Sequence, residues 1–237
     1  MAETESGKSN RLYRFLRAEH AIQAIETGRL KVSRLAELND PFDLTTAIAG
    51  VPDDTPQEKI TKLERVLIDR LNPDVGMICF CTTVADPAVW THYAQQHSGI
   101  ALGFERPSIN DPAKMIPDFI DVSYPDPSLR PVINLTEWRR MPHLKKFAKA
   151  LSTFDRKAKS WQYEKECRIF VSLKTHCTLG DGMYWYPIPK RLLVEVVVGI
   201  RCPVEMAYVE RMLADKGFLR AEVKRAKASR TKYEVEV

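Results

Sequence analysis

The chain is organised around one stretch, Trp161-Gln162-Tyr163-Glu164-Lys165-Glu166-Cys167-Arg168-Ile169-Phe170. It leads from a basic segment into an apolar run that ends near Leu173, which is typical of a β-strand whose start carries charge. Successive side chains of a strand point to opposite faces, so we expect Glu164, Glu166 and Arg168 to share one face. The two carboxylates would oppose each other's ionisation, whereas the guanidinium would favour it.

A solvated edge strand with surface ion pairs shows the same alternation of charged residues. In this chain, however, Trp161 and Tyr163 precede the charged triplet and an apolar run follows it. Ionisable groups in partly buried places are candidates for a functional site. We therefore interpret Glu164 and Glu166 as candidate catalytic residues.

The composition is that of an ordinary globular protein, with 237 residues, 44% apolar and 28% charged. We expect residues 1–10 to be disordered and residues 11–237 to form a single domain. There is no apolar run of membrane-spanning length and no apolar leader at the N-terminus, which predicts a cytoplasmic protein without membrane contact. The five cysteines are odd in number and are interpreted as reduced thiols.

Hydrophobic periodicity predicts an α+β fold with a mixed or mostly antiparallel sheet and flanking helices. Helices are expected at 20–27, 56–71, from 86 or 87 to 98 or 99, at 135–159 with a kink or a division at Pro142, and at 204–216. Strands are expected at 11–15, 30–33, 77–81, 100–104 and 120–124, in the charged stretch quoted above, and at 184–189, 192–198, 220–224 and 233–237.

The net charge of +5 is unevenly distributed. Basic residues are concentrated between Arg139 and Lys159 and again between Lys216 and Lys232. Such segments attract phosphates, which makes a nucleic-acid partner plausible. A solvated helix face and a charged tail are the more common outcome for such runs.

Three further groups of residues have the side chains that a site requires. They are Tyr13 with Arg14, the loop residues Asn39, Asp40, Phe42 and Asp43, and Trp90 with His92 and Tyr93. Proline in the loop gives it a defined shape, because Pro41 restricts both its own backbone and that of Asp40. The aromatic residues at helical spacing also match an ordinary packed stripe.

In this order, the motifs resemble the bacterial domain-of-unknown-function family 2971, and the resemblance spans most of the chain. The matching segments are Leu12-Tyr13-Arg14-Phe15, Asn39-Asp40-Pro41-Phe42-Asp43, Cys79-Phe80-Cys81, Trp90-x-His92-Tyr93-Ala94, His97-x-Gly99-Ile100-Ala101-Leu102-Gly103-Phe104 and Trp161-x-Tyr163-Glu164-x-Glu166-x-Arg168. One departure is Cys81, where the family often carries a serine. The family name supplies no activity.

The layout of these motifs is similar to arginine-serine-glutamate type ADP-ribosyltransferases, which implies an ADP-ribosyltransferase-like fold with NAD as the substrate and no metal. On this analogy Glu166 would stabilise the oxocarbenium-like cation formed as nicotinamide leaves, and Glu164 would orient the nucleophile. The acceptor of ADP-ribose would be a protein or a nucleic acid. The residues assigned to NAD binding are Arg14, Tyr13, Thr82, Trp90, His92, Tyr93 and Arg168, beside the substrate loop of Asn39, Asp40, Phe42 and Asp43.

Two other functions remain open at this stage. The first is a nucleic-acid-binding protein or a metal-dependent nuclease of a bacterial defence or toxin system. In it Asp40, Asp43, Glu164 and Glu166 would hold a divalent cation, because hard carboxylate oxygens suit magnesium. The second is a non-catalytic interaction domain, in which the aromatic motifs pack the core and a glutamate pairs with Arg168 inside it.

Overall fold

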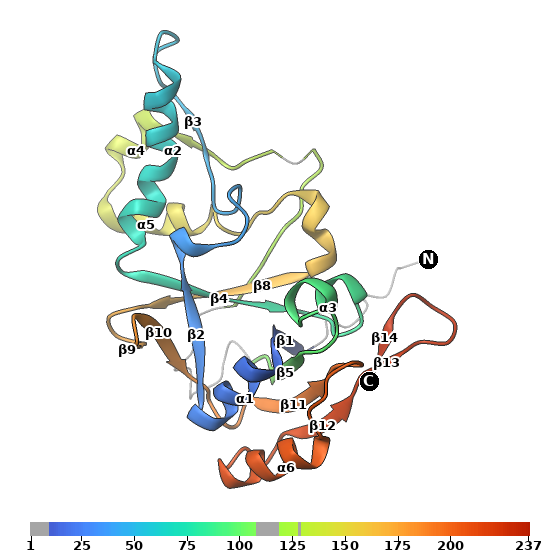
Figure 1. The fold of residues 1–237 in the computed structure, drawn as a ribbon. Coiled ribbons are helices and arrows are strands. Elements are labelled where there is room, and N and C mark those ends of the chain that lie inside the picture. The colour runs from blue at the N-terminus through green and yellow to red at the C-terminus, as the bar shows by residue number, and fades with distance from the viewer. Residues whose placement is uncertain (1–9, 108–118, 128) are drawn as a thin grey trace, which may run out of the picture.

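The computed structural model describes residues 10–107, 119–127 and 129–237 (Figure 1). Of the N-terminal segment predicted to be disordered, residues 1–9 lie outside the described part. The predicted α+β class is confirmed, because the main sheet is mostly antiparallel and helices surround it. No helix in the described ranges is long and apolar enough to cross a membrane.

The main sheet has a continuous path of strands and a short branch. Along the path the strands are β12 (Glu222–Arg225), β11 (Leu193–Val198), β5 (Ile100–Glu105), β1 (Arg11–Leu16), β4 (Val75–Cys81), β2 (Arg29–Arg34), β10 (Met183–Pro187) and β9 (Thr178–Gly180). The branch consists of β8 (Glu166–Ser172), which pairs with β4, and β6 (Phe119–Asp121), which pairs with β8. Within this sheet β11 and β12 are parallel, and the other described pairs are antiparallel.

The sheet divides at β4, which is the feature that positions the site. Strand β8 follows β4 along its whole length on one side. On the other side β1 pairs with β4 at Cys81, whereas β2 pairs with it at Gly76 and Met77. Cys79 therefore lies between the two strands, and its carbonyl accepts a hydrogen bond from Arg14 Nη1 at 2.8 Å instead of from a strand neighbour. A backbone group inside a protein needs such a partner, so the split draws the arginine toward β4.

The helices and short strands lie around this sheet. Helices α1 (Ala18–Thr27) and α6 (Met206–Asp215) contact each other at one end of the molecule (Figure 1). Helices α2 (Gln57–Leu71), α4 (Leu135–Arg140) and α5 (His143–Leu151) gather at the other end with β3 (Ala47–Ala49), which pairs in parallel with β7 (Val132–Asn134). The remaining elements are α3 (Pro87–Tyr93), the 3₁₀ turns η1 (Leu35–Glu37) and η2 (Lys159–Glu164), and the hairpin of β13 (Lys227–Ala228) with β14 (Val235–Glu236).

The predicted helix over residues 135–159 is divided at Pro142, one of the two outcomes expected there, but its expected end at Lys159 is wrong. Pro142 ends the first part outright, because α4 stops at Arg140 and α5 restarts with Pro142 as its N-cap. Helix α5 ends at Leu151, and an irregular segment then leads to η2. The consequence is that Lys157 leaves the predicted basic helix face and turns into the interior.

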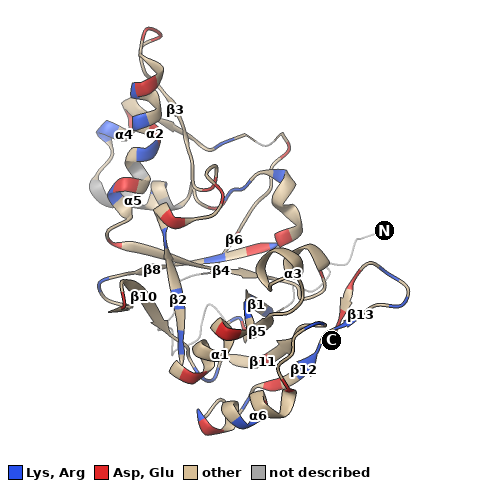
Figure 2. Cartoon of the chain, in the orientation of Figure 1, with Lys and Arg blue, Asp and Glu red and all other residues tan. Residues whose placement is uncertain are grey.

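The two basic segments lie toward opposite ends of the molecule (Figure 2). The first belongs to α4, α5 and the chain that follows, and the second to the end of α6, β12 and the final hairpin. Within the first segment Lys159 forms an ion pair with Asp126, and Lys157 is buried among carboxylates. The two segments do not join into one basic face.

Candidate functional site

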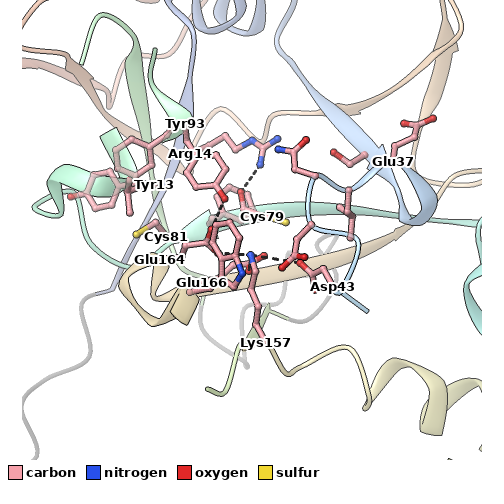
Figure 3. A pocket seen from close by; sticks show the side chains of 18 residues that line it. Tyr13, Arg14, Glu37, Asp43, Cys79, Cys81, Tyr93, Lys157, Glu164 and Glu166 are labelled. Atoms are coloured by element: carbon pink, nitrogen blue, oxygen red, sulfur yellow. Dashed lines mark hydrogen bonds and ion pairs between the residues drawn. The ribbon is translucent and has the colours of Figure 1, made fainter. Parts of the chain in front are cut away.

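A cavity of about 190 Å³ lies where β1 and β2 separate on β4. Its walls come from these three strands, from η1 and the loop after it, and from α3, η2 and β8. Segments far apart in the sequence thus meet in one place (Figure 3). The charged or hydroxyl-bearing side chains that line the cavity include those of Arg14, Asp43, Tyr93, Lys157, Glu164 and Glu166.

Glu164 and Glu166 both line the cavity, although they do not share the face of one strand as predicted. Strand β8 begins only at Glu166, and Glu164 is the last residue of η2. Between them Lys165 has the left-handed conformation, with φ of 42° and ψ of 52°. This reversal of the backbone brings two carboxylates from different elements into the same cavity. Thr82 fixes it further, because its backbone N–H donates to the Lys165 carbonyl at 3.0 Å.

Arg168 holds two of the carboxylates from beneath the cavity and is itself fully buried. Its Nε donates to Glu166 Oε1 at 2.7 Å and its Nη2 to Glu166 Oε2 at 2.8 Å. Nη2 also contacts both Asp43 oxygens, at 2.9 and 2.8 Å, and Nη1 donates to the Phe154 carbonyl at 2.9 Å. Such a forked, permanently charged donor fixes both carboxylates in position.

Lys157 is a site residue that the sequence analysis missed. Its Nζ lies 2.5 Å from Glu164 Oε2, 3.4 Å from Glu166 Oε2 and 3.6 Å from Asp43 Oδ2. It also lies 4.7 Å from the centre of the Trp161 ring, a cation–π contact. Its place in a run of basic residues indicated a surface lysine, and no local pattern distinguished it from its neighbours.

The two glutamates differ in their protonation. Burial alone would raise the pKa of Glu166, but the hydrogen bonds and charge of Arg168, with the charge of Lys157, outweigh it and lower the pKa to about 2. Burial raises the pKa of Glu164 above its usual value despite the opposing effect of Lys157. One carboxylate is therefore fixed in its ionised form, while the other is suited to take up and release a proton.

Tyr93 connects α3 to this pair. Its hydroxyl donates a short hydrogen bond to Glu164 Oε1. Burial and this bond to Glu164 raise the pKa of Tyr93, so the phenol stays protonated and remains the donor. Asp86 caps α3 by accepting from the Ala88 N–H at 2.8 Å, and Pro87 occupies its first turn. The start of the helix that carries Tyr93 is thus well defined.

Arg14 lies at the other end of the cavity (Figure 3), and Asn39 and Asp40 are also among its lining residues. One N–H of the Arg14 guanidinium is used by the Cys79 carbonyl. Cys81 also lines the cavity, at the position where the resembling family often has serine. Burial raises the pKa of the Cys81 thiol to about 12, so it stays protonated and is a poor nucleophile.

Several residues assigned to NAD binding lie outside the cavity. Trp90 is fully buried, donates from Nε1 to the Val84 carbonyl at 2.7 Å and packs edge-on against Phe15, so its ring is part of the core. The hydroxyl of Thr82 donates to the Lys165 carbonyl at 3.2 Å and thereby supports the backbone of the site. Arg168 lies behind Glu166 and Asp43 and does not itself line the cavity.

Two further predicted residues are exposed near the site. His92 lies on the outer side of α3, with its ring centre 6.0 Å from that of Tyr163. Phe42 is 74% exposed on the loop that carries Asp40 and Asp43. Neither lines the cavity, so the predicted substrate loop contributes Asn39, Asp40 and Asp43 but not Phe42.

The carboxylates of the site are paired with cations of the chain itself. Asp43 and Glu166 accept from Arg168, and Glu164 accepts from Lys157. In the part of the chain that the structure describes, no group of three or more His, Cys, Asp or Glu side chains is arranged to hold a metal ion.

Comparison with known proteins gives one match. No curated protein and no solved structure showed significant similarity to the chain. The resemblance predicted from the motifs is confirmed for the segment that runs from within α3 to the start of β8, because residues 89–169 match the family model described as "Protein of unknown function (DUF2971)".

Proposed function

We propose that this protein cleaves the bond between nicotinamide and ribose in NAD and transfers ADP-ribose to a protein or nucleic-acid acceptor. The observation that carries the proposal is the convergence of Arg14, Glu164 and Glu166 on one cavity from β1, η2 and β8. A cation at one end and two carboxylates at the other suit a substrate that has phosphates and develops positive charge during reaction.

Glu166 would stabilise the reacting sugar. As nicotinamide leaves with the bonding electron pair, positive charge develops on the ribose, and a carboxylate that is already ionised and oriented is an effective stabiliser. The pKa of about 2 keeps Glu166 ionised at neutral pH, and Arg168 prevents it from turning. Its position requires no rearrangement during the reaction.

Glu164 would act on the acceptor. An oxygen or nitrogen of the acceptor bonds to the anomeric carbon as nicotinamide departs, and its proton passes to the Glu164 carboxylate. A raised pKa favours this role, because a base is most effective when its pKa is close to the working pH. The hydrogen bonds from Tyr93 and Lys157 hold the carboxylate in place.

Binding of NAD would be shared by Arg14 and Tyr93. The guanidinium of Arg14 provides the forked donor that recognises phosphate, at the end of the cavity away from the glutamates. Tyr93 lines the cavity and is available to pack on nicotinamide, whereas Trp90 is buried in the core.

The test is release of nicotinamide from NAD by the purified protein in the presence of a metal chelator. Glu166→Gln should lower the rate by about 100-fold or more, because it removes the charge that stabilises the transition state. Glu210→Gln, on the exposed side of α6, makes the same chemical change away from the cavity and should retain the parent rate. Circular dichroism establishes that both variants are folded.

Two results would contradict the proposal. One is a parent protein that releases no nicotinamide and shows no thermal stabilisation by NAD. The other is equal release by the parent and by folded Glu166→Gln. Cleavage of nucleic acid that requires magnesium and stops with the chelator would favour the nuclease alternative instead.

A further inference from the structure

We infer that Glu195, which does not line the cavity, is a positioning residue that holds Tyr13 as one wall of it, and that Gly103 is the position that makes this contact possible. The inference rests on the proposed function for its kinetic test but on the sheet geometry for its evidence. It assigns a role to a further buried carboxylate, on β11, that none of the motifs contains.

A single row of residues crosses five neighbouring strands. The registers pair Glu195 with Gly103, Gly103 with Tyr13, Tyr13 with Cys81, and Cys81 with Glu166. Side chains at one level of a sheet project from the same face. Glu195 and the catalytic candidate Glu166 therefore stand on the same face of the sheet, at the two ends of this row.

Tyr13 spans the gap over Gly103. Its hydroxyl donates to Glu195 Oε2 at 2.8 Å, although β5 lies between the two strands. The contact requires that the strand between them have no side chain at this level. A Cβ added to Gly103 would lie 3.1 Å from Tyr13 Cε1 and 3.0 Å from Glu195 Cβ, so an alanine would require the ring or Glu195 to shift.

Glu195 is itself firmly held. Arg11 Nη1 lies 2.7 Å and Lys224 Nζ 2.6 Å from Oε1, which leaves Oε2 to accept from Tyr13. Burial would raise the pKa of Glu195, but the hydrogen bonds from Lys224, Tyr13 and Arg11 lower it below its usual value. The carboxylate is thus an ionised anchor, and a charged acceptor makes the stronger hydrogen bond.

The consequence for the site is a fixed aromatic wall. Tyr13 lines the cavity, and Figure 3 shows its hydroxyl directed away from Glu166 and Arg14. Its contribution to the cavity is therefore the ring rather than the hydroxyl. Loss of the hydrogen bond from Tyr13 to Glu195 should therefore widen or block the part of the cavity that Tyr13 lines, without a direct change to Glu164 or Glu166.

The test compares Gly103→Ala and Tyr13→Phe with Gly180→Ala in nicotinamide release from NAD. The first two variants should raise KM for NAD about fivefold, with a smaller change in kcat, because the effect of one lost hydrogen bond falls on binding. Gly180→Ala is the matched control, because a Cβ there meets nothing closer than 3.7 Å. It should retain the parent KM.

The outcomes distinguish the positioning role of Glu195 from the proposed cleavage of NAD. If the parent releases nicotinamide but both Gly103→Ala and Tyr13→Phe keep its KM, the positioning role is overturned and the proposed function stands. If the parent releases none, the proposed function fails, and crystal structures decide the positioning role. A Tyr13 ring displaced in Gly103→Ala relative to the parent would support it, and an unmoved ring would overturn it.

Discussion

At the scale of single residues, the site is defined by how its charges balance. Three carboxylates, on Asp43, Glu164 and Glu166, surround the two cations Lys157 and Arg168. Burial would lower the pKa of Lys157, but the charges of Glu166, Glu164 and Asp43 raise it instead, so the lysine stays charged. The cluster keeps a surplus of negative charge beside the cavity, which suits a cationic transition state.

Replacement of Lys157 should destabilise the fold. Lys157→Met keeps the unbranched chain but leaves the carboxylates with Arg168 as their remaining buried cation. Removing one partner of a buried ion pair should lower the free energy of unfolding by about 3 kcal/mol, and urea unfolding is the measurement that checks it. Lys159→Met, which removes an exposed ion pair with Asp126, should cost less than about 1 kcal/mol. Equal losses in the two variants would show that Lys157 has no special electrostatic role.

Glu166 should make stability depend on pH. Its pKa is lowered from 4.5 to about 2 by folding, so the folded state binds the proton less readily than the unfolded state. Its stabilising contribution is complete above pH 4.5 and is lost as the pH falls toward 2, and amounts to about 3 kcal/mol. As the pH falls through this interval, the free energy of unfolding measured with urea should decrease more for the parent than for Glu166→Gln. Parallel pH profiles of the two proteins would contradict the assignment.

At the scale of elements, the loop after η1 is joined to the sheet by an ion pair as well as by apolar packing of Leu44 with Val75 and Met77. Asp43 receives two contacts from Arg168, and the neighbouring Leu44 has a φ of 58°. The loop thereby holds Asn39 and Asp40 at the cavity while Phe42 stays exposed. An ion pair across 125 residues of sequence thus acts together with local turn contacts, such as the bond from the Phe42 N–H to Asp40, in positioning the loop.

Removing that charge should loosen the loop. In Asp43→Asn the ionic bond to Arg168 is lost, and amide hydrogen exchange in residues 40–44 should accelerate about tenfold or more, measured by mass spectrometry. Asp40→Asn is the control, because asparagine keeps the oxygen that accepts from the Phe42 N–H at 2.9 Å. Unchanged exchange in Asp43→Asn would show that the loop is held by other contacts.

Elements were predictable where their signals are local. The apolar run 77–81 and the β-branched run 192–198 predicted β4 and β11, and Gly28 correctly marked the end of α1, where its φ is 65°. The prediction failed between residues 152 and 165. There the chain is fixed by long-range contacts of Lys157 and Glu164, which have no periodic signature.

At the scale of the whole molecule, the site is a product of sheet topology. The sequence indicated that Arg14, the Asn39 to Asp43 loop, Tyr93 and the two glutamates carry chemistry, and the structure places them around one cavity. That convergence depends on β1 and β2 joining β4 at different points, which is a long-range pairing that no local pattern encodes. For the same reason no local sequence pattern identifies Glu195 and Gly103 as partners of Tyr13, because only the strand registers bring them together.

The left-handed Lys165 has a consequence for recognising such sites in other chains. Because this one residue reverses the backbone between η2 and β8, the two carboxylates meet through a turn and not through strand alternation. A Glu-x-Glu pair would reproduce this arrangement only where the middle residue tolerates positive φ, as glycine and asparagine do and β-branched residues or proline do not. The residue between the two glutamates is therefore the informative position of the motif. A search for this site in other chains, or its transfer into another chain, should require a residue there that tolerates positive φ.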